Sequence, residues 1–136
     1  MSKPGQNAPA PDQMKAFAEA DWDGPLWMIN MLKFKGQADY GNADEPARTG
    51  KEAYTHYGSL AGPFVEAVGG KPVTMLFPKH ILIGDKAEDW DELLVVEYPS
   101  REAFLSMIND PAYQATAHHR TAALERSALI ASKKVL

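Results

Sequence analysis

The chain has 136 residues, of which 45% are apolar and 24% charged, the composition of an ordinary globular domain rather than of a disordered or fibrous protein. Its 14 basic and 18 acidic residues give a formal charge of −4, so it lacks the strong positive field that holds a nucleic acid. Cysteine is absent, which excludes disulfides, thiolate nucleophiles and Cys-ligated metal sites. No run approaches the roughly 20 apolar residues of a membrane span. We therefore expect a cytoplasmic protein without a nucleic-acid or membrane partner.

The first 24 residues are expected to precede the folded domain. The first dozen are rich in Pro, Ala and Gly and predict a mobile arm. Pro11 then begins a short helix, in which Met14 and Phe17 recur at the spacing of one apolar face. A Gly-Pro pair follows and ends this region, so we predict an arm and a helix over 1–24 and a single domain over 25–136.

The rest of the chain alternates strand and helix patterns. A polar segment over 36–50 is long for a compact domain and predicts a mobile loop or a lid. The expected elements are strands over 26–35, 73–84, 91–98 and 127–135, and helices over 51–68, 99–108 and 110–125. The order strand, helix, strand, strand, helix, strand is typical of the α+β ferredoxin-like split βαβ fold, with a four-stranded antiparallel sheet.

The predicted sheet is apolar on both faces. In the first strand, Ile29 and Met31 point to one side, and Met28 and Leu32 point to the other. The strand over 91–98 shows the same pattern. The chain has too few helices to cover both faces, so we expect the open face to pack on a second copy and form a homodimer. The alternative is that the N-terminal helix and the long loop fold over this face.

Several short elements resemble domain-of-unknown-function family 1330, of the dimeric α+β barrel superfamily. The resemblance covers residues 25–132 and is strongest from Trp90 to Ile130. The elements that carry it are Asn30 in the first strand, the Tyr54 and Tyr57 pair, Gly69-Gly70, Trp90-Asp91, Glu97-Tyr98-Pro99-Ser100, Asp110-Pro111-x-Tyr113 and the later Arg120.

The resemblance implies a ferredoxin-like protomer whose sheet pairs face to face with that of its dimer mate. It implies no established activity. The superfamily is similar in fold to cofactor-independent monooxygenases, muconolactone isomerases, haem-binding peroxidases and chlorite dismutases, and stress-responsive dimers, and fold does not fix function. Residues 1–23 and 36–50 depart from the short form of the family and are expected to alter access to its cleft.

Arg120 is the most informative polar residue of the sequence. On a helix capped by Asp110, it shares an apolar stripe with Tyr113 and Leu124. A guanidinium in that position needs a partner. Glu97 is an available carboxylate, which predicts a structural ion pair, and an anionic ligand is the functional alternative.

The four histidines differ in their predicted surroundings. His56 and His118 fall on polar helix faces and are expected at the surface. His119 is rotated by about 100° from His118, so two adjacent imidazoles are not expected to chelate one metal, and no metal site is predicted. His80 lies in or beside a predicted strand with apolar neighbours. It is the candidate general base or haem ligand, and its structural alternative is a hydrogen-bonded residue at a sheet edge.

The remaining candidate ligand-binding residues are Asn30, Tyr54, Tyr57, Glu97 and Tyr113. Asn30 interrupts an apolar strand and is expected to form an inward hydrogen bond. The two tyrosines on the predicted helix over 51–68 lie on a core stripe, so they are either core residues or phenols that reach a cleft. No hydrolase, zincin, P-loop or dinucleotide motif is present, and no cofactor is predicted.

These observations predict a homodimer that binds a small organic molecule and leave open whether it is an enzyme. One hypothesis is a cofactor-free oxygenase or isomerase, in which His80 moves a proton and Arg120 holds an anion. A second is a non-catalytic ligand-binding or stress-response dimer. A third is a haem protein with His80 as axial ligand.

Overall fold

The computed structural model describes residues 7–41 and 44–136, so the first half of the predicted arm lies outside the described residues. Its sheet has four strands in the order β2-β3-β1-β4, and all three pairings are antiparallel. The strands are β1 (Leu26–Phe34), β2 (Lys71–Leu76), β3 (Glu92–Tyr98) and β4 (Leu124–Ser132). This topology confirms the predicted ferredoxin-like fold.

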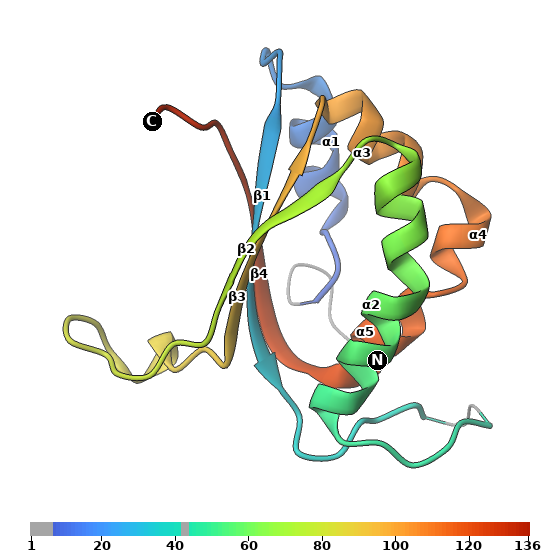
Figure 1. Ribbon diagram of the computed structural model, residues 1–136, viewed down its shortest axis with the longest axis vertical. Coiled ribbons are helices and arrows are strands. Elements are labelled where there is room, and N and C mark those ends of the chain that lie inside the picture. The colour runs from blue at the N-terminus through green and yellow to red at the C-terminus, as the bar shows by residue number, and fades with distance from the viewer. Residues whose placement is uncertain (1–6, 42–43) are drawn as a thin grey trace.

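The helices lie on one side of the sheet (Figure 1). They are α1 (Pro11–Glu19), α2 (Gly50–Ala67), α3 (Arg101–Ile108), α4 (Pro111–Gln114) and α5 (Ala117–Ala123), with a short 3₁₀ turn η1 (Lys86–Glu88) before β3. In the described ranges, no helix is both long and apolar enough to cross a membrane.

Capping residues set the two ends of α2. The Thr49 side chain accepts a hydrogen bond from the Glu52 backbone, and the Glu52 carboxylate accepts one from the Thr49 backbone, which forms a capping box. The helix runs through Pro63. It ends before Gly69, whose φ of +83° is the left-handed conformation that favours glycine.

The core fills the space between the sheet and the helices. At one end, residues from β1 and β3 pack against α3, and the Tyr98 and Phe104 rings meet edge to face at 5.1 Å. At the other end, β1 and the start of β4 pack against α2. The buried residues of the two clusters are Leu26, Met28, Val96, Tyr98, Phe104 and Met107, and Leu32, Ala53, Tyr54, Ala123 and Leu124.

The opposite side of the sheet, which we call the open face, is not covered by the described residues. Ile29 lies between Val95 and Ile130 in the register of β3, β1 and β4, and Ile130 is 48% exposed. Leu76 continues this apolar surface onto β2 and is 54% exposed. The open face is therefore a continuous apolar surface.

The N-terminal helix and the long loop do not cover the open face. Phe17 of α1 packs edge to face on Phe104 of α3, at 5.8 Å between ring centroids. In the loop over 35–49, the Asp39 backbone N–H donates to the carbonyl of Ala122 in α5. Both segments contact the helices, so the alternative in which they fold over the open face is wrong for the described residues.

Two predicted elements differ from the structure. The strand expected over 73–84 ends at Leu76, and residues 77–85 form an irregular segment that projects on the open side of the sheet (Figure 1). From here on, the arm means this segment, 77–85, and not the N-terminal residues. Its residues Leu82 and Ile83 are 85% and 92% exposed. The helix expected over 110–125 is broken between α4 and α5, because both the backbone N–H and the hydroxyl of Thr116 donate to the Tyr113 carbonyl.

The junction of β1, α2 and α5 leaves no room for a side chain at Gly50. A Cβ there meets the carbonyl oxygens of Lys35 and, at 2.7 Å, Ala123. We expect Gly50→Ala to lower the free energy of unfolding by about 2–3 kcal/mol. Gly58, in the exposed middle of the same helix, has nothing within 4 Å of a built Cβ.

Gly58→Ala is therefore the matched control, and we expect it to raise the free energy of unfolding by about 0.5–1 kcal/mol. Urea unfolding of both variants measures the two effects. Equal stability of the Gly50 variant and the original protein would contradict the packing described at this junction.

Candidate functional site

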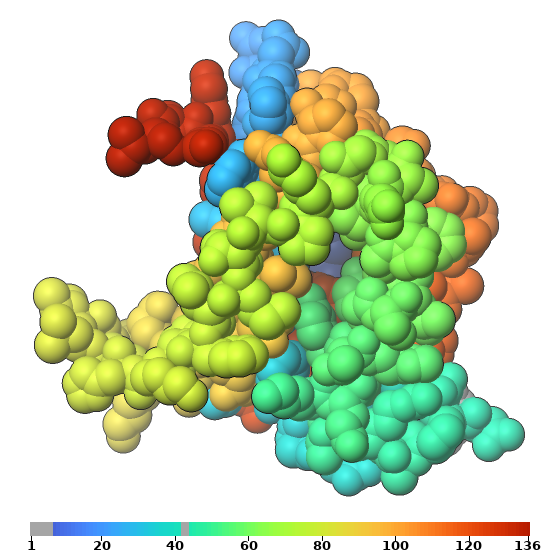
Figure 2. Space-filling view, viewed as in Figure 1, coloured from blue at the N-terminus to red at the C-terminus, as the bar shows by residue number. Residues whose placement is uncertain are grey.

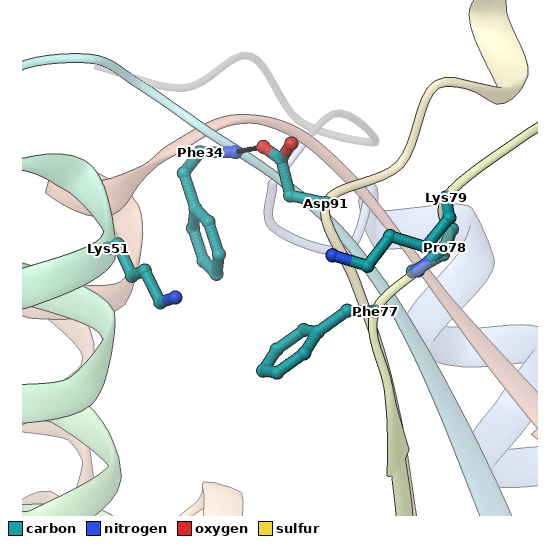
Figure 3. Close-up of a pocket in the computed structure, with 6 residues that line it drawn as sticks. All are labelled: Phe34, Lys51, Phe77, Pro78, Lys79 and Asp91. Carbon is teal, nitrogen blue, oxygen red and sulfur yellow. Dashed lines mark hydrogen bonds between the residues drawn. The ribbon is translucent and has the colours of Figure 1, made fainter.

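A cavity of about 390 Å³ opens between the start of α2 and the segment that follows β2. The space-filling view shows the surface hollowed between these two elements (Figure 2). Two aromatic rings, two lysines, a proline and an aspartate surround it (Figure 3). We call it the α2–β2 cavity, and its lining residues are Phe34, Lys51, Phe77, Pro78, Lys79 and Asp91.

The cavity carries an excess of positive charge. The Asp91 carboxylate accepts a hydrogen bond of 2.9 Å from the Phe34 backbone, and its other oxygen lies 3.5 Å from Nζ of Lys33, outside the cavity lining. Lys51 lies over the Phe77 ring, with Nζ 5.2 Å from its centroid. Among the described residues, no carboxylate lies within 4.0 Å of the ammonium group of Lys51 or of Lys79. Their ammonium groups are available to a ligand.

Glu92 is a buried carboxylate next to the cavity wall. It pairs with Leu32 across β1 and β3, so it points to the helical side, and only 5% of it is exposed. Burial raises the pKa of Glu92, and the nearby charge of Lys51 opposes this shift. The carboxyl group is therefore held nearer to neutrality than that of a surface glutamate.

A cluster of tyrosines continues inward from Phe34. The Phe34 and Tyr54 rings are 5.5 Å apart, and the Tyr54 and Tyr57 rings are 5.4 Å apart. The Tyr57 and Tyr113 hydroxyls form a hydrogen bond of 2.6 Å. Burial raises the pKa of both Tyr54 and Tyr57, against the opposing charge of Arg120. The phenols are therefore neutral hydrogen-bonding groups.

Arg120 is half-buried at the inner end of this cluster. Its Nη1 donates a hydrogen bond of 3.2 Å to the Asn7 carbonyl. Its Nη2 is buried and has no hydrogen-bond partner among the residues described. A buried guanidinium N–H without a partner is costly, and a ligand oxygen would remove that cost.

The predicted ion pair between Arg120 and Glu97 does not form. Glu97 accepts a hydrogen bond of 2.7 Å from Nε1 of Trp27 and lies 3.6 Å from Nζ of Lys71. It pairs with Trp27 across β3 and β1 and sits on the open face, whereas Arg120 lies on the helical side. The alternation of side chains along β3 separates the two groups.

Four of the sequence-predicted residues lie together, and Glu97, Asn30 and His80 do not join them. Arg120 lies near enough to Tyr54 and Tyr57 for its charge to act on both phenols, and Tyr113 is hydrogen-bonded to Tyr57. Asn30 also faces the helical side and donates a hydrogen bond of 3.2 Å to the Leu94 carbonyl, which confirms its expected bond. His80 lies in the arm rather than in a strand, and it is exposed. It directly follows Lys79 in the sequence but does not itself line the cavity. Its role as a base stays a prediction.

The sequence analysis missed both cavity lysines and Glu92. Lys51 could have been found from the sequence, because it is the second residue of a helix that a capping box predicts. The buried residues Ala53 and Tyr54 follow it on the same helix. Lys79 carries none, since its position depends on how the chain leaves β2. A buried Glu92 contradicts the ordinary preference of glutamate for the surface and is visible only once the strand register is known.

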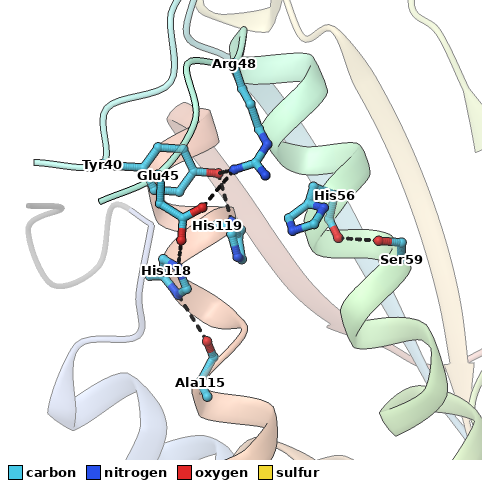
Figure 4. A network of polar contacts seen from close by, with 8 residues as sticks. All are labelled: Tyr40, Glu45, Arg48, His56, Ser59, Ala115, His118 and His119. Carbon is cyan, nitrogen blue, oxygen red and sulfur yellow. Dashed lines mark hydrogen bonds and ion pairs between the residues drawn. The ribbon is translucent and has the colours of Figure 1, made fainter. Parts of the chain in front are cut away.

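The histidines also differ from expectation. His119 is buried, with 4% exposed, and its ring lies 4.0 Å from that of His118 and 4.5 Å from that of His56, measured between centroids. The prediction that the two adjacent imidazoles point apart is wrong, because they occupy the first turn of the short helix α5 rather than the middle of a long one. They form a second polar cluster outside the α2–β2 cavity (Figure 4).

The chain is similar to two solved structures of RPA0582, a protein of unknown function from Rhodopseudomonas palustris. The methylated form shares 38% identity, with a TM-score of 0.89 and coverage of 97% of this chain and 96% of that one. The other crystal structure also shares 38% identity, with a TM-score of 0.87 and coverage of 98% and 99%.

A more distant likeness supports the fold alone. A dabb family protein with a ferredoxin-like fold from Mesorhizobium loti is 14% identical, with a TM-score of 0.53, and the alignment covers 82% of this chain and 98% of that one. Among curated proteins, none matches.

The match to a protein family covers most of the folded part of the chain. It spans residues 45–133 and thus includes the helices α2, α3, α4 and α5 and the strands β2, β3 and β4. It confirms the resemblance drawn from the sequence motifs. The chain belongs to the family described as Domain of unknown function (DUF1330).

Proposed function

We propose that the protein is a homodimer that binds a small organic anion with an apolar body in the α2–β2 cavity. The observation that carries the proposal is the combination of two phenylalanine rings with two unpaired lysines around a cavity of about 390 Å³. Cavities of roughly 300–1,000 Å³ with apolar walls and a few polar groups are typical of small-molecule sites.

The chemistry of the lining favours a carboxylate or a similar anion. Phe34 and Phe77 offer contact to an apolar or aromatic body, and Lys51 and Lys79 offer two ammonium groups. Asp91 does not cancel this charge, because its carboxylate is already bonded to the Phe34 backbone and paired with Lys33. A neutral molecule of the same shape would leave the lysines without a partner.

Arg120 and the tyrosines extend the site inward. The unpartnered Nη2 of Arg120 and the hydroxyls of Tyr54 and Tyr57 are suited to a second polar group on the ligand. This supports a molecule with one anionic end at the lysines and an acceptor at its other end. Asn30, on the same side of the sheet, is the remaining candidate contact.

The open face supports the homodimer. Ile29, Leu76 and Ile130 form an apolar surface that no described segment covers, and the arm projects on the same side of the sheet. A second copy of the same sheet is complementary to such a surface, as in other isologous dimers. The arm also supplies Phe77, Pro78 and Lys79 to the cavity, so packing against a partner would hold one cavity wall in place.

The charge requirement of the cavity can be tested with benzoate and its neutral analogue benzyl alcohol. We expect benzoate to bind more tightly in isothermal titration calorimetry. Lys51→Met should weaken benzoate binding about fivefold to tenfold, which equals about 1–1.4 kcal/mol, and leave benzyl alcohol unchanged. Lys51 is exposed, so the variant should fold.

Lys15→Met is the control, because Lys15 is an exposed lysine on α1, outside the cavity. It should bind benzoate as the original protein does. The proposal is contradicted if the two probes bind equally, or if Lys51→Met loses no more affinity than Lys15→Met.

Glu92 gives the site a pH-dependent cost. Because the folded state raises its pKa, ionisation of Glu92 destabilises the fold. The cost is absent at a pH below the pKa of an unfolded glutamate, about 4.3, and grows as pH rises through the higher folded pKa. We expect Glu92→Gln to melt at a higher temperature than the original protein at pH 7.5 and at a similar one at pH 4.

Thermal melts of Glu92→Gln at both pH values make this measurement. Glu102→Gln is the control, because 72% of the Glu102 side chain is exposed. A Glu92→Gln variant that is less stable than the original protein at pH 7.5 would show that the buried carboxylate supports the fold instead.

The dimer can be tested by placing a charge on the open face. We expect Ile130→Glu to halve the mass measured by light scattering during size-exclusion chromatography, because a buried unpaired carboxylate is costly in an interface. Leu60→Glu, at a 38% exposed leucine on the outer side of α2, should keep the original mass. An unchanged mass for Ile130→Glu would place the interface elsewhere.

A further inference from the structure

The second polar cluster lies where the loop over 35–49 meets α2 and α5 (Figure 4). One donor atom each from Glu45, His118 and His119 lies within 4.8 Å of the other two. His118 Nε2 and Glu45 Oε2 are 3.2 Å apart. We propose that these three side chains form a binding site for one divalent transition-metal ion of the zinc class.

The distances suit such an ion after a small adjustment. Zinc binds imidazole nitrogen and carboxylate oxygen at about 2.0–2.2 Å, which separates two donors of a tetrahedral site by about 3.4 Å. The pair formed by His118 and Glu45 already has this separation. Because the three donors lie within 4.8 Å of one another, His119 has to approach by no more than about 1.4 Å, a shift that side-chain rotation can supply.

The hydrogen bonds around the two rings are compatible with metal binding through one nitrogen of each. Nδ1 of His118 lies 3.1 Å from the Ala115 carbonyl and must donate to it, because a carbonyl only accepts. Nε2 faces the Glu45 carboxylate and donates to it when the ring carries both protons, so an ion that replaces this proton is held by Nε2 and Glu45 together. Nδ1 of His119 lies 2.8 Å from the Tyr40 hydroxyl. A partner on the second ring nitrogen is the usual arrangement for histidines that bind a metal.

Charge and burial favour a borderline metal over calcium or magnesium. Arg48 Nη1 donates a hydrogen bond of 3.0 Å to Oε1 of Glu45, which neutralises the carboxylate and leaves Oε2 to the ion. One carboxylate with two imidazoles suits zinc, nickel or copper, whereas magnesium and calcium require more oxygen donors. The His118 side chain is 47% exposed and gives solvent access, whereas His119 is buried.

His56 lies beside the three proposed ligands but is not one of them. Its ring lies 4.5 Å from that of His119, and Figure 4 shows it on α2, across from the two histidines of α5. The bound ion would fasten Glu45, in the loop that precedes α2, to the two histidines of α5.

The test is titration of the full-length protein with Zn²⁺ alone at pH 7.5, monitored by competition with a chromophoric chelator. We expect one Zn²⁺ per chain. His118→Ala and Glu45→Gln should each weaken binding at least about tenfold. His80→Ala is the matched control, because His80 is an exposed histidine in the arm, and it should bind as the original protein does.

Three outcomes would overturn the proposal: no saturable site, equal affinity of His118→Ala and the original protein, or a loss in His80→Ala as large as that in His118→Ala. Because His118 is half-exposed, its variant should keep the helix and strand signals in circular dichroism. Should it unfold, Glu45→Gln provides the same comparison. Mg²⁺ at the same concentration should not displace Zn²⁺.

Discussion

The constraint on which the structure depends is that both faces of the sheet are apolar, whereas the helices cover only one of them. A four-stranded sheet with apolar side chains on both faces needs two layers of packing, and the helices supply only one. On the covered side, β1 and β3 bury Leu32 and Val96 against the helices. On the other side, Ile130 and Leu76 remain exposed. This exposed apolar face is the basis of the proposed homodimer, in which a second copy covers it.

The same architecture positions the candidate site. The start of α2 is fixed by its capping box and by the tight junction at Gly50, and this places Lys51 beside the end of β1. The opposite wall comes from the arm, which projects toward the open side of the sheet. In the proposed function, ligand binding and dimer formation therefore share one segment. The buried Glu92 and the unpartnered nitrogen of Arg120 are both costly to the fold, and such costs are common where a site must receive a ligand.

The sequence predicted the fold well because its signals are local. Strand alternation, helical periodicity and the helix end at Gly69 each follow from neighbouring residues. The candidate site was predicted only in part, because it depends on contacts between distant segments. The sequence pattern predicts a pair between Arg120 and Glu97 because Glu97 is an available carboxylate on the preceding strand, yet strand alternation places Glu97 on the other face. The apolar residues after β2 favour a strand, but they form the arm instead. The break before α5, which brings His118 and His119 together, leaves no clear pattern in the sequence.

Native mass spectrometry of the freshly purified protein tests the central claim most directly, because one spectrum reports the number of subunits and any retained small molecule. The account predicts a mass of two chains of 14.9 kDa each, with a reproducible additional mass where a ligand survives purification. A monomer at every concentration would contradict it, because the apolar open face would then have no cover and the cavity wall formed by the arm would have no support.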